Sequence, residues 1–295
     1  MSTLSNLTKN ISYILSIAII LLACAPKSIV TTTMIYPPLS ETESFLVITE
    51  EDTIDISSAE VIGEIRIKDN GLSFNCNYET VLALATKEAR QKGANGLKIY
   101  EHQGPDLIST CHRIKAQALR LKNVREYEKE ITWHPGRRLE QLDFKGTLEN
   151  RPFRAATMSY IRYNYFAQPF SSKFTFQVET VFDCRNSYLK EGNNPELVLE
   201  HEQGHFDMAE IFARKYLKAI QNQVHDLKDF EKNHARLYRE IQEAMILEQD
   251  KYDTDIYADR SKQKNWLQHI DQELENLEAY SDKKIELPLV NKSKS

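Results

Sequence analysis

From residue 195 to about residue 280 the apolar residues recur with the period of an α-helix, which limits the C-terminal part of the chain to packed helices. Residues 193–196 (Asn-Asn-Pro-Glu) are typical of a helix start, because they combine an asparagine cap, a proline in the first turn and an acidic residue. We expect one helix to about residue 228, a second over 229–251 and a third over 261–280, with a break at 252–260.

The segments before this helical part have the character of β-strands. Residues 174–182 alternate apolar and polar side chains, and residues 131–133 and 155–165 are rich in aromatic and β-branched side chains. Together they predict an antiparallel sheet, so that the second half of the chain combines a sheet with C-terminal helices in an α+β arrangement. The polar tail after Lys283 is expected to fray.

The first residues have the features of an export signal. Residues 11–23 form an uncharged apolar run that is too short to span a bilayer as a helix and has the length of a signal-peptide core. The run ends in Leu-Leu-Ala-Cys, which resembles the lipobox of bacterial lipoproteins. We expect residues 1–23 to be a lipoprotein signal peptide, Cys24 to carry the lipid, and the Ser/Thr/Pro-rich residues 24–42 to be a tether.

This interpretation places an exported protein in the bacterial cell envelope, anchored to the membrane through the lipid on Cys24 and facing the periplasm. The alternative is a signal anchor in which the cysteine is incidental. The net charge of -5 gives no case for nucleic-acid binding, which requires a basic face. Export permits disulfide bonds, and because Cys76 and Cys111 lie in the same half of the chain, we expect them to pair. Cys184 is then left over and is predicted to be buried.

Residues 43–121 predict a small α/β module stapled by that disulfide. Strand-like segments at 45–48, 61–67, 97–100 and 111–119 surround a helix expected over residues 78–92. No residue of this module has a spacing typical of catalysis, and His102 and His112 are interpreted as surface histidines. The charged residues 122–130 mark the expected domain boundary.

The sequence His201-Glu202-Gln203-Gly204-His205 fits the pattern His-Glu-x-x-His on the first C-terminal helix. At about 100° per residue, His201 and His205 differ by about 40° and stack one turn apart, so that both imidazoles converge on one Zn²⁺ ion. Zinc lowers the pKa of a water molecule, and Glu202 is the candidate general base that takes its proton for attack on a peptide bond. The alternative is a solvent-facing helix with incidental histidines.

A catalytic zinc site needs a third protein ligand. Asp253, in the expected break between the second and third helices, is the first choice, and Asp255 in the same break is an alternative. Asp207 and Glu210 point away from the metal on a straight helix and are expected to be solvated or structural, although Glu210 stays open as a ligand.

Three further residues are candidates for contact with a substrate. Tyr252 or Tyr257 is a candidate oxyanion donor, and Arg214 is a candidate for binding a substrate carboxylate. Ordinary packing or a surface salt bridge is the alternative for each of them.

Residues 131–280 resemble the bacterial family called domain of unknown function 922, which is described as zinc-dependent proteases. The resemblance covers about half of the chain, and the run 199–207 is its most specific part. It rests on Trp133, Leu139, Asp143-Phe144-Lys145-Gly146, Ala155-Ala156, Phe182-Asp183, Ser187-Tyr188, the run 199–207, Ala209-Glu210, Ala213-Arg214, Tyr252-Asp253, Gln263 and Trp266. The resemblance implies a zincin-like domain over residues 131–283, a peptide or protein substrate and Zn²⁺ as the cofactor.

The chain departs from this family at one motif. We expect Tyr-Asp-x-x-Thr-x-His-Gly between the last helices, but Ile256 stands for the threonine and Ala258 for the histidine. Two functions therefore stay open. One is a membrane-anchored zinc metallopeptidase with Glu202 as general base and His201, His205 and Asp253 as ligands, which the presence of Glu202 favours. The other is a non-catalytic, metal-stabilised envelope lipoprotein that binds or scaffolds, which the missing histidine favours.

Overall fold

The computed structural model describes residues 26–41, 43–69, 76–107, 109–167 and 171–290. The expected signal peptide over residues 1–23 and the lipidation site Cys24 lie outside the described residues. The chain forms two compact units, one ending at Tyr127 and the next beginning at Glu128. In the part of the chain that the structure describes, no helix is both long enough and apolar enough to cross a membrane.

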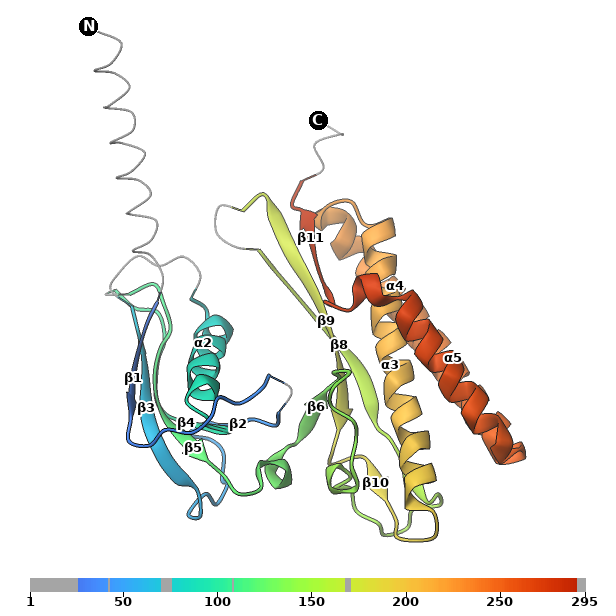
Figure 1. Ribbon diagram of the computed structural model, residues 1–295. Helices are drawn as coiled ribbons and strands as arrows, with labels where there is room; N and C mark the ends of the chain where they lie inside the picture. The colour runs from blue at the N-terminus through green and yellow to red at the C-terminus, as the bar shows by residue number, and fades with distance from the viewer. Residues whose placement is uncertain (1–25, 42, 70–75, 108, 168–170, 291–295) are drawn as a thin grey trace, which may run out of the picture. The chain divides into compact units, whose positions relative to one another are not determined.

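The first unit is a five-stranded sheet with one helix packed against it (Figure 1). The strand order is β1-β3-β5-β4-β2, in which β2 and β4 are parallel and the other neighbours are antiparallel. The bounds are β1 Lys27–Thr32, β2 Leu46–Ile48, β3 Glu60–Lys68, β4 Gly96–Gln103, β5 Arg113–Arg120 and α2 Tyr78–Gln91. The helix and the strands expected within residues 43–121 are therefore found.

The helix α2 begins and ends where the sequence provides caps. The side chain of Asn77 accepts a hydrogen bond from the backbone N–H of Thr80 at 2.8 Å. After the last turn comes Gly93, whose φ of 78° is readily adopted only by glycine. The Cys76–Cys111 disulfide is present as predicted, and it ties the start of α2 to the segment before β5.

The prediction that residues 24–42 serve only as a tether is wrong for residues 27–32. They form β1, which pairs with β3 in a register that runs from Lys27↔Lys68 to Thr32↔Gly63. Residues 27–32 do not alternate apolar and polar side chains, so the sequence does not indicate a strand there. This edge strand is held mainly by its backbone pairing with β3. The pairing is close at Gly63, where a Cβ atom would collide with the carbonyl oxygen of Thr31.

We predict that the double change Cys76→Ser and Cys111→Ser lowers the free energy of unfolding of the first unit by about 3–4 kcal/mol, because the bond closes a loop with a sequence separation of 35. Hydrogen exchange of the α2 and β5 amides in the full chain measures this change. The buried free Cys184 of the second unit supplies the control Cys184→Ala. Unchanged exchange in the first unit of the double variant would contradict a stabilising disulfide.

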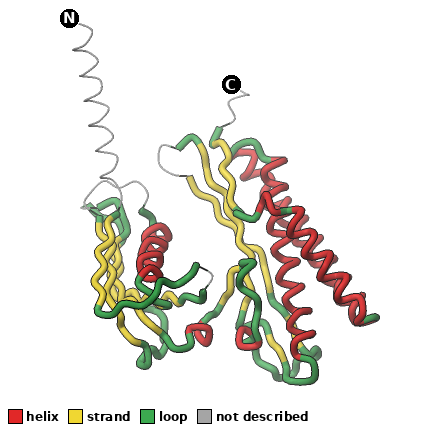
Figure 2. Tube along the Cα trace, viewed as in Figure 1, coloured by secondary structure: helices red, strands yellow, loops and turns green. Residues whose placement is uncertain are grey.

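The second unit is an antiparallel sheet that packs against the C-terminal helices (Figures 1 and 2). β8 pairs with β9 along its length, β11 and β6 pair with the two ends of β9, and β7 pairs with β10. The strands are β6 Glu130–Thr132, β7 Ala155–Ala156, β8 Ser159–Ala167, β9 Lys173–Asp183, β10 Tyr188–Leu189 and β11 Lys284–Pro288. The helices are α3 Pro195–Gln223, α4 Leu227–Ala258 and α5 Gln263–Asn276, with short 3₁₀ turns at Gln141–Asp143, Arg260–Lys262 and Glu278–Tyr280. The antiparallel sheet and the C-terminal helices are thus confirmed.

Two predictions for the C-terminal part are wrong. The break expected at residues 252–260 begins only after Ala258. Tyr252 and Ile256, one turn apart, are buried in an apolar cluster with residues of α3 and α5. This burial favours a continuous helix although the segment around them is polar. The tail after Lys283 does not fray at once but forms β11, whose Leu287 is buried in the main core of the unit.

Candidate metal centre

The helix α3 is the buried centre of the second unit. Every residue from His201 to Arg214 is buried, and the helix contacts β9, α4 and α5. Burying a polar side chain without a partner costs free energy, so the histidine, carboxylate and arginine side chains of α3 need partners on each face.

On the face toward α4, three ligand atoms converge. The Oδ1 atom of Asp253 lies 3.0 Å from Nε2 of His201 and 3.1 Å from Nε2 of His205, and the two Nε2 atoms are 3.3 Å apart. Ligand atoms placed tetrahedrally at about 2.05 Å from a zinc ion are about 3.3 Å from one another. Among the described residues this is the one group of three or more His, Cys, Asp or Glu side chains with ligand atoms close enough to hold a metal ion.

The third member comes from the expected residue but from an unexpected element. Asp253 lies inside α4, which passes beside α3, and not in a break between helices. Asp255 does not join the group, because its carboxylate accepts from Lys262 Nζ at 2.7 Å and Trp266 Nε1 at 3.2 Å. Only an aspartate on the α4 face that packs toward α3 can reach both imidazoles.

Two neighbours of Asp253 on α4 orient the imidazoles. The Oε1 atom of Gln249 lies 3.3 Å from Nδ1 of His205, an acceptor that would hold the ring proton on Nδ1 and leave Nε2 free to bind a metal ion. The ring of Tyr252 stacks on His201 with 4.7 Å between centroids and 11° between planes, and its hydroxyl donates to the carbonyl oxygen of His201 at 3.2 Å. Gln249 was not predicted from the sequence, although its spacing of one turn from Asp253 is a usable signal.

Gly204 is explained by this packing. A Cβ atom at position 204 would lie 3.0 Å from Cζ of Tyr252 and closer still to its hydroxyl oxygen. The close approach at this glycine is therefore made by a tyrosine of α4. Because the hydroxyl of Tyr252 is buried and already donates to α3, Tyr252 is not available as an oxyanion donor.

The charges in the site influence one another. Burial raises the pKa of Glu202, and the positive charges of the two imidazoles offset this only in part. Burial alone would lower the pKa of His205, but its hydrogen bond to Asp253 and the charge of Glu202 outweigh burial and raise it. Burial alone would raise the pKa of Asp253, but hydrogen bonds from His201 and His205 hold it well below its usual range. Asp253 is therefore ionised and ready to bind a cation.

The residues present fit a zinc ion. Two imidazoles and one carboxylate are typical zinc ligands, and three protein ligands leave a fourth position, as catalytic sites do. Beside these ligands, the buried Oε2 atom of Glu202 has no hydrogen-bond donor among the described residues. A water molecule at the fourth position of the metal could donate a hydrogen bond to it. The side chain of Asp253 is 38 % exposed, whereas those of His201 and His205 are 10 % and 11 % exposed, so the site opens on the Asp253 side.

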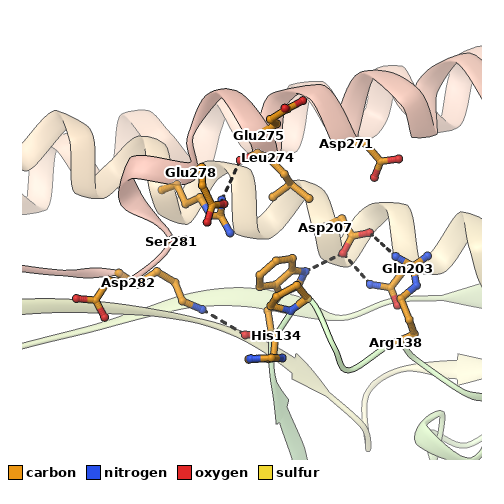
Figure 3. A pocket seen from close by; sticks show the side chains of 14 residues that line it. His134, Arg138, Gln203, Asp207, Asp271, Leu274, Glu275, Glu278, Ser281 and Asp282 are labelled. Carbon is orange, nitrogen blue, oxygen red and sulfur yellow. Dashed lines mark hydrogen bonds and ion pairs between the residues drawn. The ribbon is translucent and has the colours of Figure 1, made fainter. Parts of the chain in front are cut away.

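The opposite face of α3 carries a polar network that satisfies itself (Figure 3). Asp207 accepts from Trp133 Nε1 and Gln203 Nε2, both at 2.7 Å, and Glu210 accepts from Arg214 Nε at 2.9 Å. Both carboxylates are structural and buried rather than solvated, and Glu210 is excluded as a metal ligand because it faces away. The interpretation of Arg214 as a substrate binder is wrong, because Glu210 and a backbone carbonyl take its donors.

Other candidate residues are placed as follows. Tyr257 lies at the mouth of the metal centre, with its ring 6.1 Å from that of His201 and 65 % of the residue exposed. Cys184 is buried, as predicted.

In the first unit, Nε2 of His102 and Nδ1 of His112 lie 2.8 Å apart, a contact that the sequence does not reveal because a loop separates the two residues. A distance of 2.8 Å corresponds to one hydrogen bond between the two rings. Among the described residues, no carboxylate or cysteine lies close enough to complete a metal-binding group with this pair.

Comparisons of the chain with protein-family models, curated proteins and solved structures return no match. The family resemblance therefore rests on the residues quoted above.

We predict opposite pH trends for the melting temperature of the metal-free protein and for the increase in melting temperature that zinc causes. A pKa raised on folding, as for His205 and Glu202, gives stability that is lost as pH rises through the folded pKa. The melting temperature of the metal-free protein should therefore fall from pH 6 to pH 8. Zinc binds only the deprotonated ligands, so the increase in melting temperature that zinc causes should grow over the same range.

Calorimetric scans at several pH values, with and without zinc, test this. His205→Gln is the matched variant, and it should flatten both trends. A zinc effect that does not depend on pH would contradict binding at these imidazoles.

Proposed function

We propose that the second unit is a zinc-dependent peptidase carried by a lipid-anchored protein of the bacterial cell envelope. The observation that carries the proposal is the convergence of His201, His205 and Asp253 beside the buried Glu202. Two imidazoles, one carboxylate and a neighbouring base are the set that metal-assisted peptide hydrolysis requires. Export, the lipid on Cys24 and a periplasm-facing position belong to the proposal and rest on residues 11–24.

The resemblance to the domain of unknown function 922 family supports the same proposal. Its segments 199–207 and Tyr252-Asp253 are far apart in sequence, yet they supply the His–His–Asp group together. The histidine that is missing at Ala258 is not needed to complete three ligands, since Asp253 provides the third ligand atom. This is the reason to prefer a zinc-dependent enzyme over a non-catalytic lipoprotein.

Each residue has a distinct role in the proposed reaction. A zinc ion bound by His201, His205 and Asp253 would polarise a peptide carbonyl and lower the pKa of water. Glu202 is the general base, and burial raises its pKa toward the range in which a base works well at neutral pH. Tyr252 holds the imidazoles in place and does not touch the substrate.

Tyr257 is the proposed donor to the negative charge that develops on the substrate carbonyl oxygen. It lies one turn after Asp253 on α4 and overhangs His201 with most of its surface exposed. Burial of part of the ring, followed by the charges of Asp253 and Glu202, raises the pKa of its hydroxyl. The hydroxyl therefore stays protonated and able to donate.

The alternative function is a binding or scaffolding lipoprotein that keeps the metal without hydrolysis. Two observations favour it: the departures at Ile256 and Ala258, and the Nδ1 atom of His201, which is buried without a hydrogen-bond partner among the described residues. Metal-binding histidines usually donate this second ring nitrogen to a neighbour. Loss of turnover with retention of zinc separates the two functions.

We predict that the full chain and its Glu202→Gln variant each hold about one zinc ion, because Glu202 is not a ligand. His205→Ala and Asp253→Ala should lose it, since each removes one of three ligand atoms. Elemental analysis after dialysis measures the metal content, and Asp255→Ala, which removes a carboxylate outside the group, is the matched control. Zinc lost from Asp255→Ala but kept by Asp253→Ala would overturn the assignment.

Peptide cleavage by the zinc-loaded protein, followed by mass spectrometry of a mixed peptide library, then tests the enzyme itself. Glu202→Gln should reduce cleavage by a factor of about 10² or more while zinc is retained. Equal cleavage by both proteins would show a contaminating protease and would leave the scaffolding alternative standing.

We predict that Tyr257→Phe lowers kcat by about 10²-fold and leaves the zinc content unchanged, because it removes one donor to the developing charge. KM should change little, since the ring and its packing remain. The matched control is Tyr280→Phe, a tyrosine outside the metal centre on the turn after α5. A change in KM alone would assign Tyr257 to substrate binding instead.

A further inference from the structure

Two lysines lie directly opposite each other at one end of the sheet of the first unit. Lys27 is the first residue of β1, and it is paired in register with Lys68, the last residue of β3. Both are exposed, and neither forms an ion pair with an acid among the described residues. Like charges that face each other across two antiparallel strands destabilise the pairing. The fold itself therefore does not account for this pair of lysines.

Both lysines point to the side of the sheet that α2 leaves uncovered (Figure 1). The hydroxyl of Ser28 donates to Glu88 of α2 at 2.9 Å, so the preceding residue, Lys27, points to the opposite side. Ile67 is buried in the apolar cluster that the sheet shares with α2, so the following residue, Lys68, points the same way as Lys27. The two ammonium groups thus project from one open surface.

The same side of the sheet is hollowed beside Lys68. The hollow has a volume of about 280 Å³ and its charged lining residues are four cations and two acids, namely Arg66, Lys68, Arg113, Lys115, Asp69 and Glu101. Glu101 accepts from Lys115 at 2.6 Å, and Asp69 accepts from the hydroxyl of Ser109 at 2.7 Å. Arg66 pairs with Glu64 and Arg113 pairs with Asp106. Among the described residues, Lys68 is therefore the cation of this hollow that has no acidic partner.

This corner of the sheet is tied closely to the proposed lipid anchor. Lys27 follows Cys24 by three residues, so the two Cα atoms lie within about 11 Å of each other. A lipid on Cys24 that is inserted in a membrane would therefore hold Lys27 and the opposite Lys68 at the level of the phospholipid headgroups.

An exposed apolar side chain lies at the same end of the sheet. The pairing of β3 with β5 ends at Ile67 opposite Ile114, and the connection from β4 to β5 lies beyond this point. Leu107 in this connection is fully exposed. A single exposed leucine is ordinary. Cations next to an exposed apolar side chain, however, are typical of a protein surface that contacts lipid headgroups.

We propose that Lys27 and Lys68 bind the phosphate groups of anionic phospholipids and so hold this end of the first unit on the membrane. This inference rests on the lipid anchor at Cys24 in the proposed function. The short distance along the chain and the charge of the lysines select headgroups as the occupant. The whole chain has a net charge of -5, so an anionic membrane favours an orientation in which these two lysines face the lipid.

The test uses the full chain expressed in a bacterium, extracted in its processed form and reconstituted into vesicles. One set of vesicles is phosphatidylcholine, and the other is an equal mixture of phosphatidylcholine and phosphatidylglycerol. Acetylation followed by mass spectrometry measures how fast each lysine reacts, and the intact mass shows whether Cys24 carries a lipid. We expect Lys27 and Lys68 to react about fivefold more slowly on the mixed vesicles, and high salt should remove this difference. The exposed Lys87 of α2 is the matched control and should react equally on both.

A fluorescent probe extends the test to variants. Leu107→Cys supplies an accessible thiol for an environment-sensitive fluorophore, because the other cysteines are the proposed lipidation site, the disulfide pair and one buried residue. Emission should rise on the mixed vesicles relative to phosphatidylcholine alone. Lys27→Gln together with Lys68→Gln should abolish this rise, whereas Lys87→Gln should keep it. A rise that persists in the double variant would overturn the role of the two lysines.

The outcomes separate this inference from the proposed function. Equal reaction rates on both kinds of vesicle, in protein that carries a lipid on Cys24, overturn the headgroup site and leave the anchor standing. A Cys24 without lipid overturns the anchor and the inference together. Protection of both lysines by inorganic phosphate on phosphatidylcholine vesicles would show a site for a free anion and would overturn the assignment to lipid.

Discussion

The second unit depends on the burial of α3 on every side. A helix in that position must satisfy polar side chains on all its faces, and it does so in two ways. Toward the sheet and α5, Asp207 and Glu210 accept hydrogen bonds from donors that are part of the fold. Toward α4, His201 and His205 meet a single carboxylate. The first arrangement needs nothing from outside, whereas the second gathers three ligand atoms around one point.

The contact between Gly204 and Tyr252 sets the register between α3 and α4. Glycine inside a helix costs about 1 kcal/mol relative to alanine, and here it leaves a notch into which the tyrosine hydroxyl fits. Once Tyr252 occupies that notch, the next residue, Asp253, is carried to the two imidazoles. A shift of α4 by one residue would bring Tyr252 or Thr254 there instead. The His201–His205–Asp253 group, which could hold a metal ion, is thus a consequence of helix packing, not only of the motif on α3.

The sequence predicted local features better than relations between elements. Helical periodicity, the strand alternation and the Cys76–Cys111 pairing were within reach because each follows from nearby residues or from few alternatives. Asp253 was correctly chosen but wrongly placed, since the polar segment around it hides the buried pair Tyr252 and Ile256. Gln249 was missed because its one-turn spacing from Asp253 gains meaning only once α4 is known to pack against the two histidines of α3.

The two faces of α3 also bear on catalysis against mere metal binding. Folding alone would favour partners for every buried carboxylate, and the sheet-facing side of the helix shows that this chain can supply them. Glu202 is as deeply buried as Asp207, each with 4 % exposure, yet its Oε2 atom lacks a donor among the described residues. A metal site that only stabilised the fold would not need a carboxylate oxygen without a donor beside its ligands. In the proposed peptidase, Glu202 would use this oxygen to accept a proton from water.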